Sequence, residues 1–140
     1  MARFVVEPGI AVKWFLPEEY SNPAARLLDG GNELMAPDTL WFNAGRLITA
    51  KVRLGELSPD EGAQIIQAVQ SVPVKLQPSQ PLLEPALRIA AFLDLPLGDG
   101  LGLAVAVHGD CRLVTASRTL YEKVQKTPFS VHVKWVGDIR

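Results

Sequence analysis

The chain has 140 residues, of which 48% are hydrophobic and 21% are charged, and its formal net charge at pH 7 is −1. These values are ordinary for a soluble globular protein and predict a single domain over residues 1–140 with a sizeable hydrophobic core. The charge balance excludes the strongly basic composition typical of nonspecific nucleic-acid binders, although a local basic groove stays possible.

The first half of the chain alternates short apolar runs with helical patterns. Residues 3–6 form a short run that is apolar after Arg3 and ends at the turn residues Glu7-Pro8-Gly9, which predicts a strand buried on both faces with Glu7 at its carboxyl end. Asn43 and Arg46 are three residues apart and should share one side of a long helix. The other elements expected here are helices over 10–15 and 18–28, a strand over 33–36 and that long helix over 37–54.

The second half begins with a well-marked helix start. Ser58 can cap the helix, Pro59 suits its first position and Glu61 completes a capping box. The elements expected after this helix are a strand over 72–76, a helix over 81–93, a helix that contains Asp99 and ends near 109, a strand over 112–115, a helix over 117–126 and a strand over 131–136. This alternation predicts an α/β fold, a three-layer α/β/α sandwich with a mostly parallel central sheet.

Three polar residues fall where function collects in open parallel sheets, beyond the carboxyl ends of the strands. Glu7 follows a strand and is either a site residue or a solvated turn residue. Asp99 can cap its helix or help to hold a metal ion, and the two roles are compatible. Ser117 follows a strand and either caps the next helix or takes part in catalysis.

Cysteine content and apolar run length bear on the cellular location. The single cysteine, Cys111, cannot form an internal disulfide, and without a Cys or His cluster no structural zinc site is expected. No apolar run reaches the roughly 18 residues that a membrane helix needs. Glu7 and Pro8 interrupt the first apolar run, so no secretory signal is expected. We therefore expect a cytoplasmic protein with no membrane attachment.

Four segments spread over nearly the whole chain carry a family resemblance. They are Val5–Phe15, Ala36–Asn43, Leu95–Ala104 and Leu113–Tyr121. In order and spacing they resemble the four motifs of PIN-domain proteins, particularly VapC-type toxins. The resemblance implies a metal-dependent endoribonuclease of a toxin–antitoxin pair, in which acidic residues hold one or two Mg²⁺ or Mn²⁺ ions that activate water. It also implies three possible partners: RNA, an antitoxin-like protein and a second copy of the chain.

The resemblance assigns the site position by position. Glu7 stands where the family has Asp, Asn43 where it has Glu, and Ser117 where it has Asp, whereas Asp99 and Thr115 are retained. Two of the four expected anionic ligands are therefore neutral. Because hard divalent cations are held chiefly by anionic oxygen ligands, we expect weak metal binding by Glu7 and Asp99 and weakened or lost nuclease activity.

Basic residues near these motifs raise two further questions. Arg46 stands where active members of the family commonly carry Asn, and its guanidinium could pair with Glu7 and Asp99 in place of a cation. It could equally be an exposed arginine on a solvated helix face. A larger basic set either flanks the site as an RNA groove or is scattered over the surface: Lys13, Lys51, Arg53, Arg118 and Lys123.

The stretch Gly98–Gly102 superficially resembles a glycine-rich nucleotide-binding loop. That loop requires a preceding strand, and here a helix is expected, so Gly100 and Gly102 should instead allow close helix packing. Three classes of function stay open. They are a working toxin nuclease with a reduced ligand set, a catalytically inactive PIN module that binds a partner or RNA, and an unrelated nucleotide-binding α/β domain.

Overall fold

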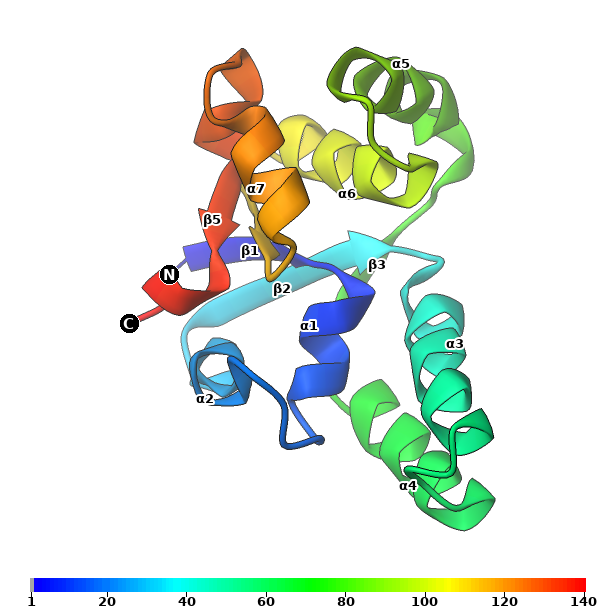
Figure 1. Ribbon diagram of the computed structural model, residues 1–140. Helices are drawn as coiled ribbons and strands as arrows, with labels where there is room; N and C mark the ends of the chain where they lie inside the picture. Colours follow the sequence, from blue (N-terminus) through cyan, green and yellow to red (C-terminus); the bar gives the residue numbers. More distant parts are fainter. Residues whose placement is uncertain (1) are drawn as a thin grey trace.

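The computed structural model describes residues 2–140 and contains one five-stranded sheet with the strand order β3-β2-β1-β4-β5 (Figure 1). The strands are β1 (Ala2–Val6), β2 (Asn32–Pro37), β3 (Lys75–Gln77), β4 (Arg112–Thr115) and β5 (Val133–Trp135). Each neighbouring pair is parallel. The expected mostly parallel sheet is therefore confirmed, and β3 lies at its edge, beginning three residues later than the strand expected over 72–76.

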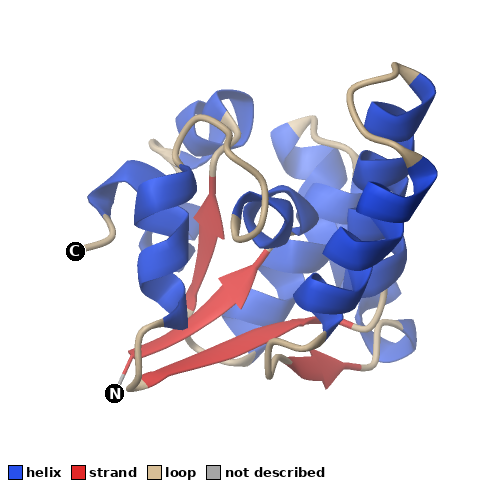
Figure 2. Cartoon of the chain, turned by 90° about the horizontal axis from the view of Figure 1, so that it is seen from below, coloured by secondary structure: helices blue, strands red, loops and turns tan. Residues whose placement is uncertain are grey.

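Helices cover both faces of this sheet. They are α1 (Pro8–Lys13), α2 (Ser21–Ala25), α3 (Leu40–Arg53), α4 (Pro59–Gln70), α5 (Leu83–Leu93), α6 (Leu97–His108) and α7 (Arg118–Val124). Short 3₁₀ turns occupy Arg26–Leu28, Gln80–Leu82, Pro128–His132 and Val136–Asp138. Helices α1 to α4 lie on one side of the sheet and α5 to α7 on the other (Figure 1), and the strands fan out between these layers (Figure 2). The three-layer α/β/α prediction is confirmed.

Alternation along the strands produces two hydrophobic cores, one on each face. Val6 and Val114 face the core under α1, α3 and α4, together with Ile10 and Ile48. The preceding residues in the same strands face the core under α6 and α7, as Val5 does. Because successive side chains of a strand point to opposite faces, a strand buried on both sides must be apolar throughout.

Local sequence signals account for where several helices begin. The Ser58 hydroxyl accepts from the Glu61 amide at 3.1 Å, and the Glu61 carboxylate accepts from the Ser58 amide at 2.8 Å. The predicted capping box is thus confirmed. Ser117 caps α7, since its hydroxyl accepts from the Leu120 amide at 3.2 Å.

The glycine-rich stretch lies inside α6 and follows α5, as expected, so it does not form the strand–loop–helix unit of a nucleotide-binding loop. A Cβ at Gly100 would collide with the Ala86 carbonyl oxygen of α5, and one at Gly102 would lie 3.3 Å from Leu113 Cδ1 of β4. These glycines therefore permit close packing against neighbouring elements.

Three further predicted elements differ from the structure. The helix expected over 18–28 is a short α-helix followed by a 3₁₀ turn, and the strand expected over 131–136 is only Val133–Trp135. Residues 128–132 turn instead, because Thr127 caps a 3₁₀ turn through a hydrogen bond from the Phe129 amide. The helix expected from residue 37 begins at Leu40, because Pro37 still pairs with β3 and the Asp38 amide donates to the Gln77 carbonyl.

Among residues 2–140, no single helix is long and apolar enough to cross a membrane. The segments 80–93 and 97–108 satisfy the length and composition requirements only together, as a pair bent by 115°.

Candidate functional site

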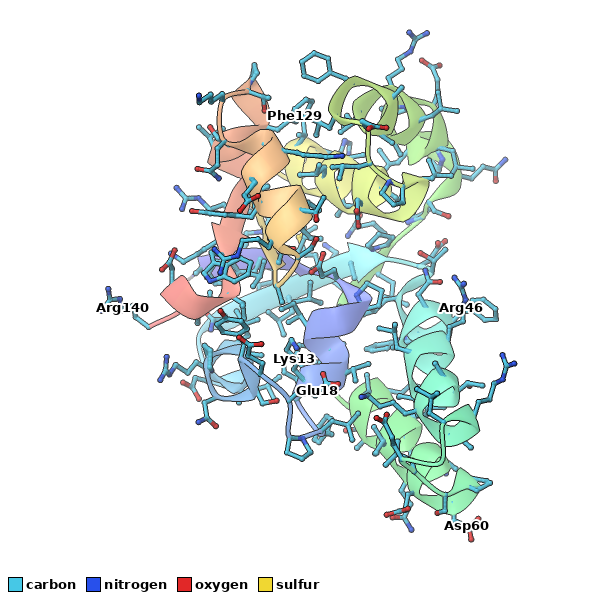
Figure 3. All side chains as sticks on the ribbon, in the orientation of Figure 1. Lys13, Glu18, Arg46, Asp60, Phe129 and Arg140 are labelled. Carbon is cyan, nitrogen blue, oxygen red and sulfur yellow. The ribbon has the colours of Figure 1, made fainter. Side chains whose placement is uncertain are left out.

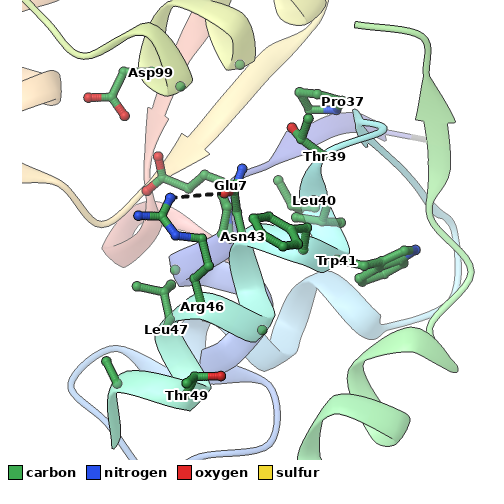
Figure 4. Close-up of a pocket in the computed structure, with 18 of the residues that line it drawn as sticks. Glu7, Pro37, Thr39, Leu40, Trp41, Asn43, Arg46, Leu47, Thr49 and Asp99 are labelled. Atoms are coloured by element: carbon green, nitrogen blue, oxygen red, sulfur yellow. Dashed lines mark hydrogen bonds between the residues drawn. The ribbon is translucent and has the colours of Figure 1, made fainter. Parts of the chain in front are cut away.

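A pocket of about 1040 Å³ opens beyond the carboxyl ends of the central strands (Figure 4). Its walls come from the end of β1, from α3 and from the first turn of α6, and Ser117 joins them from the start of α7. Glu7, Asn43 and Asp99 also line it, so four of the five residues assigned by the resemblance share one cavity. Thr115 lies fully buried behind this wall, at the end of β4.

Glu7 is fixed by the neighbouring strand end. Its Oε1 atom accepts hydrogen bonds from the Thr115 hydroxyl at 2.9 Å and from the Ala116 amide at 3.1 Å. The Thr115 hydroxyl in turn accepts from the Ser117 amide at 2.9 Å. The structure therefore explains the retained threonine, which links the Glu7 carboxylate at the end of β1 to the backbone before α7.

Burial makes Glu7 an unusual carboxyl group. It raises the pKa of Glu7 from 4.5 to about 7, because desolvation outweighs the hydrogen bonds from Thr115 and Ala116. The negative charge of Asp99 raises the pKa further, and the positive charge of Lys13 lowers it. The interpretation of Glu7 as a solvated turn residue is therefore wrong, since its carboxyl group lies in the pocket and is held by two donors.

Asp99 approaches the same pocket from the opposite side, in the first turn of α6 (Figure 4). The N-cap residue of α6 is Pro96, and no side-chain cap is formed there, so the interpretation of Asp99 as an N-cap is wrong. Its position in the first turn still places a negative charge near the positive end of the helix dipole. Partial burial raises the pKa of Asp99.

Arg46 projects from α3 into the pocket, and its Nη1 atom donates to Asn43 Oδ1 at 3.4 Å (Figure 4). Among residues 2–140, no ion pair joins Arg46 to Glu7 or to Asp99. The hypothesis that Arg46 replaces a cation by pairing with both carboxylates is therefore not met by this geometry. The guanidinium group pairs with a neutral amide and keeps further donors available.

The oxygen ligands that the pocket offers determine whether a divalent cation such as Mg²⁺ or Mn²⁺ fits here. Carboxylates come from Glu7 and Asp99, and only neutral oxygens come from Asn43 and Ser117. Within the described part of the chain no three His, Cys, Asp or Glu side chains are grouped to hold one ion. Glu7 Oε1 already accepts two hydrogen bonds. Because hard cations depend on several anionic oxygens, these residues do not fit a tightly bound divalent metal.

Of the two alternatives for the basic set, a groove flanking the site or scattered surface cations, the structure favours the second, because four of the five residues have partners outside the pocket. Lys13 and Lys51 both pair with Glu18, at 3.4 and 3.0 Å, and Figure 3 shows Lys13 beside Glu18. Arg118 lies over the Trp135 ring at 4.6 Å. The fourth, Lys123, pairs with Asp94.

Only Arg53 of this set lines the pocket, where Arg46 joins it. Both belong to α3, and so does the exposed pocket residue Phe42. Sequence analysis did not identify Phe42, although the spacing 42, 46, 53 places all three on one face of a helix. A search for aromatic and basic residues at helical spacing next to the motif residues could have found this wall.

The tryptophans are mainly structural. Trp14 is buried and donates to the Ala24 carbonyl at 3.1 Å. Trp41 packs against the core under α3, and Trp135 contacts the ring of Tyr20 edge-on at 5.3 Å. Trp14 is thus a core residue, whereas Trp41 and Trp135 are partly buried and Trp41 also reaches the pocket wall.

Comparison with known proteins identifies the fold. No family model and no curated protein sequence matches the chain. The crystal structure of PAE2754 from Pyrobaculum aerophilum aligns with a TM-score of 0.72 and 19% sequence identity, over 97% of this chain and 90% of that chain. A chain from a toxin–antitoxin complex of Klebsiella pneumoniae aligns with a TM-score of 0.60 and 13% identity, over 96% of both chains. At these identities the similarity shows a shared fold.

Proposed function

We propose that this chain is a PIN-like protein of the VapC type whose metal-dependent endoribonuclease activity is weakened or lost. One observation carries the proposal: Glu7, Asn43, Asp99 and Ser117, which come from four separate motifs, line one pocket. A pocket beyond the carboxyl ends of parallel strands is also where this class of fold places its ligands. The shared fold with a chain of a toxin–antitoxin complex supports the same assignment.

The chemistry of the pocket explains why activity would be reduced. A divalent cation in a nuclease supplies an activated water molecule and stabilises the charge on the phosphate. Here two neutral side chains, Asn43 and Ser117, occupy positions for which the resemblance implies carboxylates. The remaining carboxylate Glu7 is longer than aspartate and is tied to Thr115 and Ala116. The pocket therefore lacks the charge, and one of the free oxygens, that tight binding needs.

A second candidate function follows from the same four potential metal ligands. The chain would be a catalytically inactive PIN module that acts by binding an antitoxin-like protein, a second copy of itself or RNA. The observation that favours it is the absence of a third anionic ligand among the described residues. Cleavage activity distinguishes the two candidates, because only the first retains any metal-dependent hydrolysis.

The first experiment is calorimetric titration with Mn²⁺. The parent protein is compared with the double variant Asn43→Glu/Ser117→Asp, which restores four carboxylates. We expect no saturable binding to the parent in the micromolar range and clear binding to the double variant. The matched control is Asn43→Glu/Thr49→Asp, since Thr49 also lines the pocket but stands outside the four motif positions.

Each other result has a definite meaning. Tight binding by the parent would show that two carboxylates suffice and would favour a working nuclease. Failure of the double variant, or equal binding by the control, would contradict the assignment of the four positions to one metal site. Cleavage of a labelled single-stranded RNA by the metal-binding variant, with EDTA as the negative control, then tests the endoribonuclease class.

A further inference from the structure

An aspartate followed by a glycine occurs twice in the chain, as Asp29-Gly30 and as Asp99-Gly100. In such a pair the backbone nitrogen of the glycine can attack the carboxyl carbon of the aspartate, because a residue without a Cβ leaves that nitrogen accessible. The attack requires that the aspartate backbone can rotate and that the glycine amide is not held in a hydrogen bond. The structure gives the two pairs opposite environments.

The Asp29-Gly30 pair lies in the turn between the 3₁₀ turn Arg26–Leu28 and β2 (Figure 1). Asp29 and Gly30 are exposed, and so is Gly31. A Cβ at either glycine would have no heavy atom within 4 Å. Two consecutive glycines therefore follow this aspartate in open space, which leaves the backbone with unusual conformational freedom.

No contact within the described chain restrains this pair. Among residues 2–140, the Gly30 amide donates no backbone hydrogen bond. The Asp29 carboxylate forms no ion pair within the same range. Both reacting groups, the nitrogen and the carboxyl carbon, are thus accessible in the folded protein.

The Asp99-Gly100 pair is held in the first turn of α6. The Gly100 amide donates to the Pro96 carbonyl at 3.2 Å, and the Asp99 amide donates to the same oxygen at 3.1 Å. Gly100 is buried, and its backbone packs against the Ala86 carbonyl of α5. Rotation of the Asp99 backbone toward its own carboxyl group would break this helical turn and the contact between α5 and α6.

We propose that Asp29 is a site of spontaneous isomerisation to isoaspartate and that the fold protects Asp99 from the same reaction. In the first step the Gly30 nitrogen bonds to Asp29 Cγ, and a carboxyl oxygen leaves as water together with the proton of that nitrogen. The product is a five-membered succinimide ring. Water then opens the ring at one of its two carbonyl groups, which gives either aspartate or isoaspartate. Water is released and then consumed, and no oxidation or reduction occurs.

Isoaspartate at residue 29 would add one methylene group to the main chain of the turn. Little chain is available to absorb it, because the Asn32 side-chain amide donates to the Leu27 carbonyl at 3.3 Å across the turn. Leu27 is buried in the core, and Asn32 pairs with Ala2 of β1. We therefore expect the modified protein to have a lower free energy of unfolding. The partner that fits this product is a methyltransferase that recognises isoaspartate and uses S-adenosylmethionine.

This modification is independent of the proposed function. The turn precedes the first residue of β2, whereas the pocket includes Pro37 at the carboxyl end of that strand. The two features therefore lie at opposite ends of the sheet. Failure of the metal titration and failure of this proposal are separate outcomes.

Prolonged incubation of the folded parent protein at neutral pH and physiological temperature, followed by peptide mapping, tests the proposal. Trypsin places Asp29 in the peptide 27–46 and Asp99 in the peptide 89–112. Electron-transfer fragmentation locates isoaspartate within each peptide, and methylation by an isoaspartate methyltransferase measures its amount. Isoaspartate should form at Asp29 about tenfold or more faster than at Asp99, because reaction at Asp99 must wait for local opening of α6.

Incubation in concentrated urea is the matched control for the fold. Both pairs have the same chemistry once α6 is unfolded, so the two rates should become similar. Gly30→Ala should slow the reaction at Asp29 several-fold, because its methyl group shields the attacking nitrogen, and a Cβ there meets no neighbour. Gly98→Ala changes an equally open glycine that follows no aspartate and should leave the rate at Asp29 unchanged. Circular dichroism melting curves check that both variants are folded.

Three results would overturn the proposal. The first is a rate at Asp29 that is equal to or lower than the rate at Asp99 in the folded protein. The second is a difference between the two sites that persists in urea, since it would not depend on the fold. The third is an unchanged rate at Asp29 in folded Gly30→Ala.

Discussion

Glu7 is the residue on which most of the site chemistry depends. Its carboxyl group lies in the pocket, held by Thr115 and by the Ala116 amide. A glutamate with a pKa of about 7 binds a proton in the folded protein that it would release in the unfolded chain. The consequence can be measured as a pH dependence of stability.

The free energy of unfolding should fall as the pH rises from about 4.5 to about 7. In this window the folded state holds the Glu7 proton and the unfolded state has lost it, so unfolding releases a proton and becomes easier as the pH rises. The expected loss from Glu7 alone is up to about 3 kcal/mol, and below pH 4.5 the contribution is constant.

Urea denaturation at pH 4.5 to 8 measures this effect as a difference between the parent and Glu7→Gln. The amide retains an oxygen that can accept from Thr115 but does not titrate. The difference should grow in favour of the variant as the pH rises. Glu19→Gln, at an exposed glutamate, is the control, and parallel curves for the parent and Glu7→Gln would contradict the burial of this carboxyl group.

Arg46 should contribute little to stability. It is exposed, and its hydrogen bond to Asn43 is 3.4 Å long. We expect Arg46→Ala to change the free energy of unfolding by less than about 0.5 kcal/mol, the usual range for an exposed side chain. Thermal and urea unfolding measure it. A loss of several kcal/mol would reveal ion pairs with the buried carboxylates, because breaking them would leave unpaired charges.

At the scale of elements, the contact between α5 and α6 positions Asp99. Gly100 follows Asp99 directly, and its backbone packs against the Ala86 carbonyl of α5. This close approach holds the first turn of α6 in place and thereby sets the direction from which Asp99 enters the pocket. A side chain at residue 100 would push the two helices apart.

Gly100→Ala should therefore destabilise the protein by about 1–3 kcal/mol or more, since the new methyl group has backbone as its neighbour and cannot be accommodated by a rotamer change. Gly98→Ala is the matched control two residues earlier, where a Cβ would meet nothing within 4 Å. It should be neutral or stabilising by up to about 1 kcal/mol. Urea denaturation measures the free energy of unfolding of both variants. Equal changes in the two variants would contradict the close contact between α5 and α6.

At the scale of the whole molecule, the central strands of the sheet are paired on both sides, whereas the edge strands are short. β1 pairs with β2 and β4, whereas β3 and β5 contain three residues each and pair on one side only. The pocket lies beyond the central strands, so Glu7 and Thr115 are attached to the most protected part of the fold. Mobility during ligand binding should consequently be confined to the helices.

Amide hydrogen exchange measured by NMR tests this distribution. Amides of β1 and β4 should exchange roughly tenfold or more slowly than those of β3 and β5, because edge hydrogen bonds open locally at lower free-energy cost. The Val5 and Leu113 amides, in fully buried residues of the core, are the reference positions. Uniform exchange over all five strands would contradict this division.

Much of the fold could be predicted because its signals are local. The apolar run before Glu7, the capping box at Ser58 and the cap at Ser117 act within one or two turns of chain, so their residues alone determine them. The strand expected over 131–136 was partly wrong because a second local signal competes with its alternating pattern. A competing local signal, the cap formed by Thr127, turns the chain before β5.

The sequence by itself determined how strands and helices alternate along the chain and that the central strands are apolar. It also determined the motif positions Glu7, Asn43, Asp99 and Ser117. Only the tertiary structure decided what these residues meet. It tied Glu7 to Thr115, directed Lys51 to Glu18 and brought Asp99 to the same pocket as Glu7. The physical reason is that hydrogen-bond partners, desolvation and ion pairing depend on distances between residues far apart in the chain, which no local pattern encodes.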